Sequence, residues 1–197
     1  EATMMTRRSF TFSALTVAAF SQLPAQAQTE DEILIDDMSQ APLTSYGGQW
    51  QLSTDRVMGG ISQGSARMIR ENDRLAIEMT GNVSTANNGG FVQVSMRLQP
   101  RLDATGYRGV ELDVRGDGHP YWVHLRDRNT RWPWQVYHAA YETTGDWQTV
   151  RLPFASFQAY HRTTRRLDPS SITRIGLVAG YDDFQAHLKI ARVSVYR

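Results

Sequence analysis

The feature that most limits how this chain can fold is a two-residue alternation of apolar and polar side chains. Apolar residues occupy every second position over residues 75–79, 92–98 and 110–114. This period places them on one face of a β-strand that is buried on that face only. The same alternation runs through residues 188–195, but its phase changes by one residue near Ala191-Arg192, which predicts a β-bulge there.

Turn-forming residues separate these strands. They fall at residues 71–73, 86–90, 116–118, 127–130 and 144–146. No long amphipathic helix is expected, and residues 153–157 and 168–172 are each expected to form a single helical turn. Short strands at this spacing predict an all-β fold, either a sandwich or a barrel.

The first 27 residues have the composition of an export signal rather than of a folded domain. Thr6 to Phe10 (TRRSF) resembles a twin-arginine motif, an apolar run follows, and Ala25-Gln26-Ala27 suits a signal peptidase. The run is too short for a permanent membrane span. We therefore expect a twin-arginine signal peptide at 1–27, a single domain at 28–197 and a periplasmic product. The alternative is an uncleaved membrane anchor.

Charge and cysteine content exclude several classes of protein. The formal net charge is +1, and it falls to zero without Arg7, Arg8 and Glu1. No sustained basic stripe is present, so nucleic acid is not expected as a partner. The chain has no cysteine, which rules out thiol catalysis, cysteine-ligated metal and disulfide bonds.

The densest local signal is the stretch from Trp50 to Gly64 (WQLSTDRVMGGISQG). Asp55-Arg56 can pair or contact a ligand, and Gly59-Gly60 permits positive φ or close backbone approach. The segment is too broken for a helix and is expected to be a loop that leaves a strand. It is either a structural turn or part of a binding site.

Four segments in a fixed order resemble one protein family. They are TDRVMGGISQG at 54–64, NGGF at 88–91, GVELDVRGDG at 109–118 with YWVHLR at 121–126, and WQTVRLPF at 147–154. This pattern is similar to that of the complex I intermediate-associated protein 30 family, over about residues 33–197. The resemblance implies a galactose-binding-like jelly-roll β-sandwich. It also implies a non-catalytic binding role, because mitochondrial members assist assembly of respiratory complex I.

Two glycine-paired loops are expected to organise one end of this sandwich. Asp55 and Arg56 precede one glycine pair, and Asn88 precedes the other. Loops of this kind need side-chain donors and acceptors to hold their shape. These three residues are therefore candidate ligand- or partner-binding residues, with a purely structural role as the alternative.

An aromatic segment in the middle of the chain is the second candidate site. Alternation over residues 121–126 turns Trp122, His124 and Arg126 away from the core. Pro133 keeps Trp132 and Trp134 out of a central strand. Together with Tyr137 these side chains predict a recognition surface for a sugar ring or a protein. The alternative is that some of the tryptophans belong to the core.

Catalytic and metal-binding patterns are missing from the sequence. It has neither a G-x-S-x-G nor an H-E-x-x-H pattern. Alternation about the turn at Asp127 would set His119 across from His138, but two ligands are too few for a typical zinc site. Asp36-Asp37 and Asp182-Asp183 cannot form a glycosidase dyad within either doublet, although the second could hold a structural calcium. We expect no enzyme activity, no cofactor and no metal.

Two functions from different classes remain. The first is a binding module that assists assembly of a membrane or respiratory complex, with a protein partner. The alternative is a carbohydrate-binding, lectin-like domain with a glycan partner. An unrecognised hydrolase is the third and weakest hypothesis, since no catalytic constellation is visible.

Overall fold

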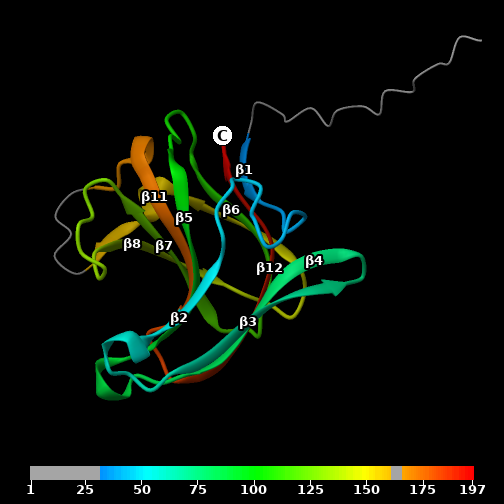
Figure 1. The fold of residues 1–197 in the computed structure, drawn as a ribbon, viewed down its shortest axis with the longest axis vertical. Coiled ribbons are helices and arrows are strands. Elements are labelled where there is room, and N and C mark those ends of the chain that lie inside the picture. Colours follow the sequence, from blue (N-terminus) through cyan, green and yellow to red (C-terminus); the bar gives the residue numbers. More distant parts are fainter. Residues whose placement is uncertain (1–31, 161–165) are drawn as a thin grey trace, which may run out of the picture.

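The computed structural model describes residues 32–160 and 166–197 as two packed antiparallel sheets (Figure 1). This confirms the predicted all-β sandwich. The expected signal peptide at residues 1–27 lies outside the described residues. Among the described residues, no helix is long and apolar enough to cross a lipid bilayer.

The first sheet is built around β12, its longest strand (Phe184–Tyr196). Along one edge of β12, β4 pairs with residues 184–190 and β1 pairs with residues 193–196, while β6 pairs along the other edge. The spatial order is β3-β4-β12-β6-β9. Its other strands are β1 (Glu32–Asp36), β3 (Gln63–Glu71), β4 (Arg74–Val83), β6 (Gly109–Arg115) and β9 (Gln148–Pro153).

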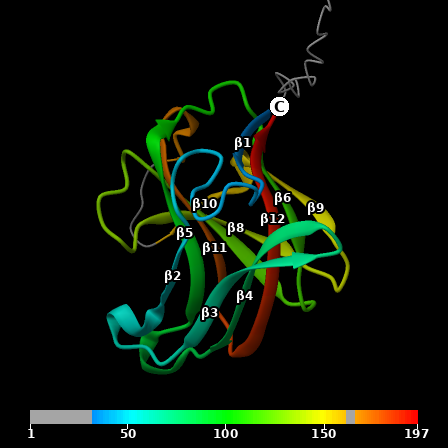
Figure 2. The same ribbon diagram turned by 45° about the vertical axis from the view of Figure 1, so that its right-hand side comes forward.

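The second sheet has the order β10-β8-β7-β11-β5-β2. In Figure 2 its strands lie beside the long red β12 of the first sheet. Its members are β2 (Gln51–Thr54), β5 (Phe91–Leu102), β7 (Pro120–Asp127), β8 (Val136–Glu142), β10 (Gln158–Tyr160) and β11 (Ile172–Gly180). In the described part of the chain, four single 3-10 turns lie between strands: η1 (Asp55–Met58), η2 (Ala86–Asn88), η3 (Phe154–Ser156) and η4 (Pro169–Ser171).

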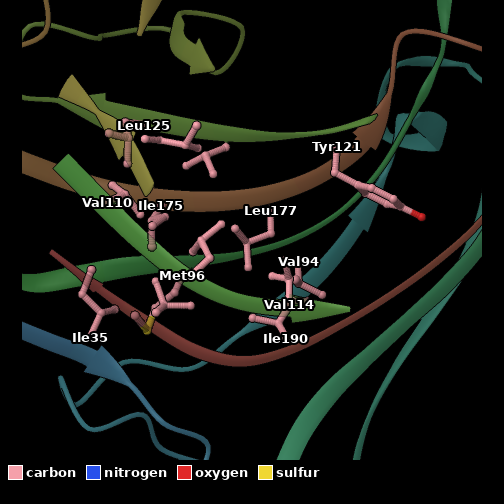
Figure 3. Packing of buried hydrophobic residues seen from close by; sticks show 14 of the residues in the cluster. Ile35, Val94, Met96, Val110, Val114, Tyr121, Leu125, Ile175, Leu177 and Ile190 are labelled. Carbon is pink, nitrogen blue, oxygen red and sulfur yellow. The ribbon is translucent and has the colours of Figure 1, made fainter. Parts of the chain in front are cut away.

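The core is formed by the alternating apolar residues of both sheets. Figure 3 shows Val94 and Met96 of β5 and Leu177 of β11 packed against Val114 of β6 and Ile190 of β12. All of these side chains are at most 1% exposed. Burying apolar side chains on facing strands stabilises the fold by roughly 1.5–3 kcal/mol for each large residue.

Several local predictions are confirmed by the structure. The register of β12 against β6 shifts between Ile190 and Arg192, where the phase change predicted a bulge. The turns η3 and η4 fall within the two segments expected to form single helical turns. The expected pairing of His119 with His138 is wrong, because the β7–β8 register sets His124 opposite His138. The connection between β7 and β8 runs over residues 128–135, whereas the expected pairing assumed a short turn at Asp127.

Candidate functional site

The predicted loop organisation at one end of the sandwich centres on the carboxylate of Asp55. Asp55 is fully buried. It accepts hydrogen bonds from the backbone and hydroxyl of Ser62, at 2.9 and 2.5 Å, and from the backbone N–H groups of Gly90 and Phe91, at 2.5 and 3.3 Å. Burial raises the pKa of Asp55, but these hydrogen bonds together lower it below the ordinary value. One carboxylate therefore joins the loop after β2 to the loop before β5.

The glycines of the two loops make room for this carboxylate. A Cβ on Gly60 would lie 2.3 Å from Cγ of Asp55, and one on Gly89 would lie 2.4 Å from its Oδ2. Gly59 has a φ of 93° and Gly90 a φ of 121°, which glycine adopts without steric cost. In Figure 1, η1 and η2 accordingly lie together at the lower end of the sandwich.

Arg56 and Asn88 have a different environment from Asp55. Both side chains are exposed, and within the described residues neither takes part in a hydrogen bond or ion pair. Asn88 contributes its backbone, which has a left-handed φ of 57°. Asp55 therefore holds this end together with the backbone of Gly90, and a binding role for Arg56 and Asn88 stays a prediction.

The second candidate site lies on the outer face of the second sheet. Trp122, His124 and Arg126 of β7 point to this face, as the alternation predicted, because Tyr121, Val123 and Leu125 fill the core. Trp122 stacks on His138 with ring centroids 4.8 Å apart and lies 4.6 Å from the ring of Tyr181. Both neighbours partly cover it. We call Trp122, His124, His138, Tyr160 and Tyr181 the aromatic platform.

Tyr181 is the link between the two candidate sites. It follows β11 with a φ of 74°, which is unusual for a bulky residue, and its backbone N–H donates to the carbonyl of Gly90 at 3.0 Å. Its hydroxyl lies 2.9 Å from Nε2 of His124 and 3.2 Å from Nδ1 of His138. The Asp55 loop thus supports the residue that covers the platform.

His124 is neutral under ordinary conditions. Burial, and next the neighbouring His138, lower its pKa to about 3. A neutral imidazole offers one donor and one acceptor, so the Tyr181 hydroxyl can both donate and accept between the two rings. The platform therefore presents ring faces and hydrogen-bonding edges, and its His124 carries no charge.

Trp132 and Trp134 lie at the opposite end of the same face. Their exposed fractions are 57% and 53%, so the exposure predicted from Pro133 is found. The two indoles stack with centroids 5.4 Å apart and planes 4° from parallel. Arg126 donates to the carbonyl of Trp132 at 3.0 Å, which places this loop beside the outer face.

Tyr137 does not belong to this surface. It is fully buried and belongs to the core cluster, and its hydroxyl donates to the carbonyl of Arg166. The expected exposure is wrong because Tyr137 shares the inward phase of Ala139 and Tyr141 on β8. His138, one residue later, takes the outward position.

The structure also contains a cavity of about 210 Å³ between the β2 and β3 edges of the two sheets. Leu43, Leu52 and Met68 contribute to its lining, with the buried carboxylate of Asp36. That carboxylate already accepts a 2.7 Å hydrogen bond from the indole of Trp50.

Among the described residues, no group of three or more His, Asp or Glu side chains is placed to hold a metal ion. Asp183 instead accepts from the backbone and hydroxyl of Thr85.

Comparison with known proteins then decides the family. The model of the family described as Complex I intermediate-associated protein 30 (CIA30) matches residues 40–190. The chain belongs to the CIA30 family. The matched range contains both loops joined by Asp55 and the whole aromatic platform. No curated protein sequence matches this CIA30 member.

Solved structures similar to this CIA30 member include carbohydrate-binding modules. One is the family 11 module of cellulosomal cellulase Lic26A-Cel5E of Clostridium thermocellum, with TM-score 0.67 and 14% identity over 84% of this chain and 94% of that one. A second is the same organism's family 11 module in complex with a β-1,3-1,4-mixed-linked tetrasaccharide, with TM-score 0.66 and 14% identity over 84% of this chain and 95% of that one. A third is the family 30 module of cellulosomal cellulase Cel9D-Cel44B of Clostridium thermocellum, with TM-score 0.51 and 14% identity over 66% of this chain and 81% of that one. At these identities the likeness concerns the fold.

Sequence reasoning missed three members of the aromatic platform. His138 was considered only as a partner of His119, and Tyr160 and Tyr181 belonged to no segment assigned to a site. A signal for Tyr181 did exist, since Gly180-Tyr181-Asp182-Asp183 has the composition of a tight turn at a strand end. What the sequence could not supply is the β11–β7 pairing that brings this turn over Trp122.

Proposed function

We propose that this CIA30 member is a non-catalytic binding module that takes a carbohydrate on the outer face of its second sheet. The observation that carries the proposal is the arrangement of aromatic rings at both ends of one sheet face, the platform at one end and Trp132 and Trp134 at the other. Sugar rings present apolar C–H faces that stack on aromatic side chains, and their hydroxyls need fixed polar partners.

Polar groups lie between the two aromatic ends. Gln93 and Ser95 of β5 share the outward phase, and Gln93 donates to the hydroxyl of Ser53 on β2. Gly176 of β11 pairs with both Ser95 and His124 and carries no side chain between them. A Cβ at this glycine would already lie 3.2 Å from Oε1 of Gln93. The centre of the face is therefore shallow and lined with donors and acceptors.

The fold relationship supports the same proposal. A module of similar fold is described in complex with a mixed-linked tetrasaccharide. A second candidate function is supported by the family itself, whose description names an intermediate of complex I. In that case the same face, rich in exposed tryptophan, would contact a protein subunit of a membrane or respiratory complex.

A glycan array distinguishes the two candidates. We expect saturable binding to a defined set of saccharides. We expect the double variant Trp132→Ala/Trp134→Ala to weaken it at least about thirtyfold, the usual effect of removing a central interface tryptophan. Val57→Ala removes an exposed apolar side chain in η1, at the Asp55 end of the sandwich, and serves as the control. Binding to no saccharide, with specific capture of a respiratory subunit, would instead favour the assembly role.

We also propose that the domain works after export to the periplasm. The support is the twin-arginine-like segment and the small-residue cleavage site within residues 1–27. Mass spectrometry of the periplasmic fraction should find a chain that begins near Gln28. An intact segment on a cytosolic product would exclude export.

A further inference from the structure

Three arginines occupy directly paired positions across the middle of the second sheet. Arg174 of β11 pairs with Arg97 of β5 on one side and with Arg126 of β7 on the other. All three alternate with core residues and so project from the outer face, the face that carries the aromatic platform. We call Arg97, Arg174 and Arg126 the arginine row.

Such a row is unfavourable without a counter-charge. Like charges directly opposite each other on neighbouring strands destabilise a sheet. Burial, followed by Arg174 and Arg97, lowers the pKa of Arg126, and burial, followed by Arg97, lowers the pKa of Arg174. Within residues 32–160 and 166–197, no carboxylate forms an ion pair with any member of the row. The arginines that form ion pairs there are Arg67, Arg115, Arg128, Arg151 and Arg192.

Several N–H donors of the row lack a hydrogen-bond partner in the described part of the chain. The Nε of Arg126 is buried and has no hydrogen-bond partner. One terminal nitrogen of Arg126 donates to the carbonyls of Thr130 and Trp132, and one of Arg174 donates to the hydroxyl of Ser95. Because each guanidinium carries five N–H groups, most of the row's donors have no partner among the described residues.

The position of the row relates it to the proposed binding face. Arg126 follows His124 by two residues on β7 and contacts the backbone of the Trp132 loop. Arg126 therefore lies between the aromatic platform and the stacked indoles, and Arg174 and Arg97 continue the row across β11 and β5. Planar guanidinium groups bind carboxylate and sulfate oxygens through paired hydrogen bonds, and this geometry suits no neutral group as well.

We infer that the carbohydrate bound on this face is an acidic one, whose carboxylate or sulfate groups contact Arg97, Arg174 and Arg126. This inference rests on the proposed function and specifies its ligand class. A uronate and a sulfated sugar share the oxyanion that the row would bind, so both are tested. An acidic protein segment is a different class of partner, and the aromatic rings on either side of Arg126 favour the sugar.

Binding is measured by affinity electrophoresis and calorimetry against polygalacturonate, a sulfated galactan, neutral mixed-linked β-glucan and poly-glutamate. We expect one of the two acidic polysaccharides to bind best. We expect Arg174→Gln and Arg97→Gln each to weaken the affinity for that acidic polysaccharide about tenfold or more, the value of a charge-assisted bidentate contact. Arg70→Gln removes the same charge from an exposed position on β3 of the other sheet and should leave the affinity unchanged.

The variants carry their own folding control. Because removal of one arginine relieves repulsion, the melting temperature of Arg174→Gln should stay equal or rise, so a loss of binding cannot be ascribed to unfolding. Binding of neutral β-glucan alone, unaffected by the two substitutions, would overturn the acidic ligand and leave the carbohydrate module standing. Equal binding of poly-glutamate would also overturn it. Binding to no polysaccharide would overturn both proposals.

Discussion

The carboxylate of Asp55 accepts a 2.5 Å hydrogen bond from the backbone N–H of Gly90, 35 residues further along the chain. The carbonyl of the same Gly90 accepts from the backbone N–H of Tyr181. Tyr181 in turn covers Trp122 and bonds His124. A buried carboxylate at the end of the sandwich thus supports the aromatic platform on its outer face.

Asp55→Asn should destabilise the domain by about 2–4 kcal/mol. The amide keeps the shape of the side chain, but its NH2 group faces donors, and buried donors left without an acceptor are costly. Chemical denaturation measures the loss. Asp146→Asn, an exposed position on the turn before β9, should change stability by less than about 0.5 kcal/mol. Equal stability of the two variants would contradict the role given to Asp55.

The two adjacent glycines of the same loop should respond differently to alanine. At Gly60 the new Cβ meets the Asp55 carboxyl group, so Gly60→Ala should cost about 2–3 kcal/mol or more. At Gly59 the Cβ would enter open space, and the only cost is the positive φ, about 1 kcal/mol. Thermal denaturation of both variants tests this order. A larger loss at Gly59 would mean that backbone conformation, not contact with Asp55, selects glycine here.

Stability should fall on acidification in a window set by His124. Its folded pKa is about 3, below the ordinary value of about 6.5, so the unfolded chain binds more protons between these values. Stability therefore rises with pH across this window, with a slope of at most about 1.4 kcal/mol per pH unit for this group. His124→Gln should flatten the curve between about pH 4 and 6.5. An unchanged slope would show that the pKa of His124 is not lowered in the folded domain.

Asp55 acts in a lower pH window, and its contribution to stability is likewise lost on acidification. Its folded pKa lies below the ordinary value near 3.9, so its contribution is present above about pH 4 and is lost as the carboxylate becomes protonated. The Asp55→Asn variant should consequently show a smaller stability loss than the wild type below about pH 4. An equal loss in both proteins would count against this assignment.

Removal of the Tyr181 ring should expose Trp122. The two rings lie 4.6 Å apart, and Tyr181 is the residue that reaches over the platform from the end of β11. Acrylamide should therefore quench tryptophan fluorescence more strongly in Tyr181→Ala than in the wild type. The increase should disappear when Trp122→Phe is added. An increase that survives the second substitution would come from another tryptophan.

The sequence predicted the sandwich well because period-two alternation is a local property of each strand. It also predicted the outward side chains of β7 and the exposure of Trp132 and Trp134, which follow from parity and from Pro133. It placed Tyr137 on the outer face beside these tryptophans without an alternation to fix its direction, and β8 turns this side chain into the core. Tyr181 and the arginine row depend on which strands are neighbours. That order is set by long-range packing, which no local pattern reports.

The central claim is that the outer face of the second sheet binds a carbohydrate, and the five indole N–H signals in an NMR spectrum test it most directly. Trp→Phe variants assign the signals, and tetrasaccharides of galacturonate and of mixed-linked glucan are then titrated. We predict that the signals of Trp122, Trp132 and Trp134 shift. Those of Trp50, bonded to Asp36, and of Trp147, beneath Arg74, should stay in place. Shifts confined to Trp50 or Trp147 with a bound saccharide, or no shift with any saccharide, would contradict the account.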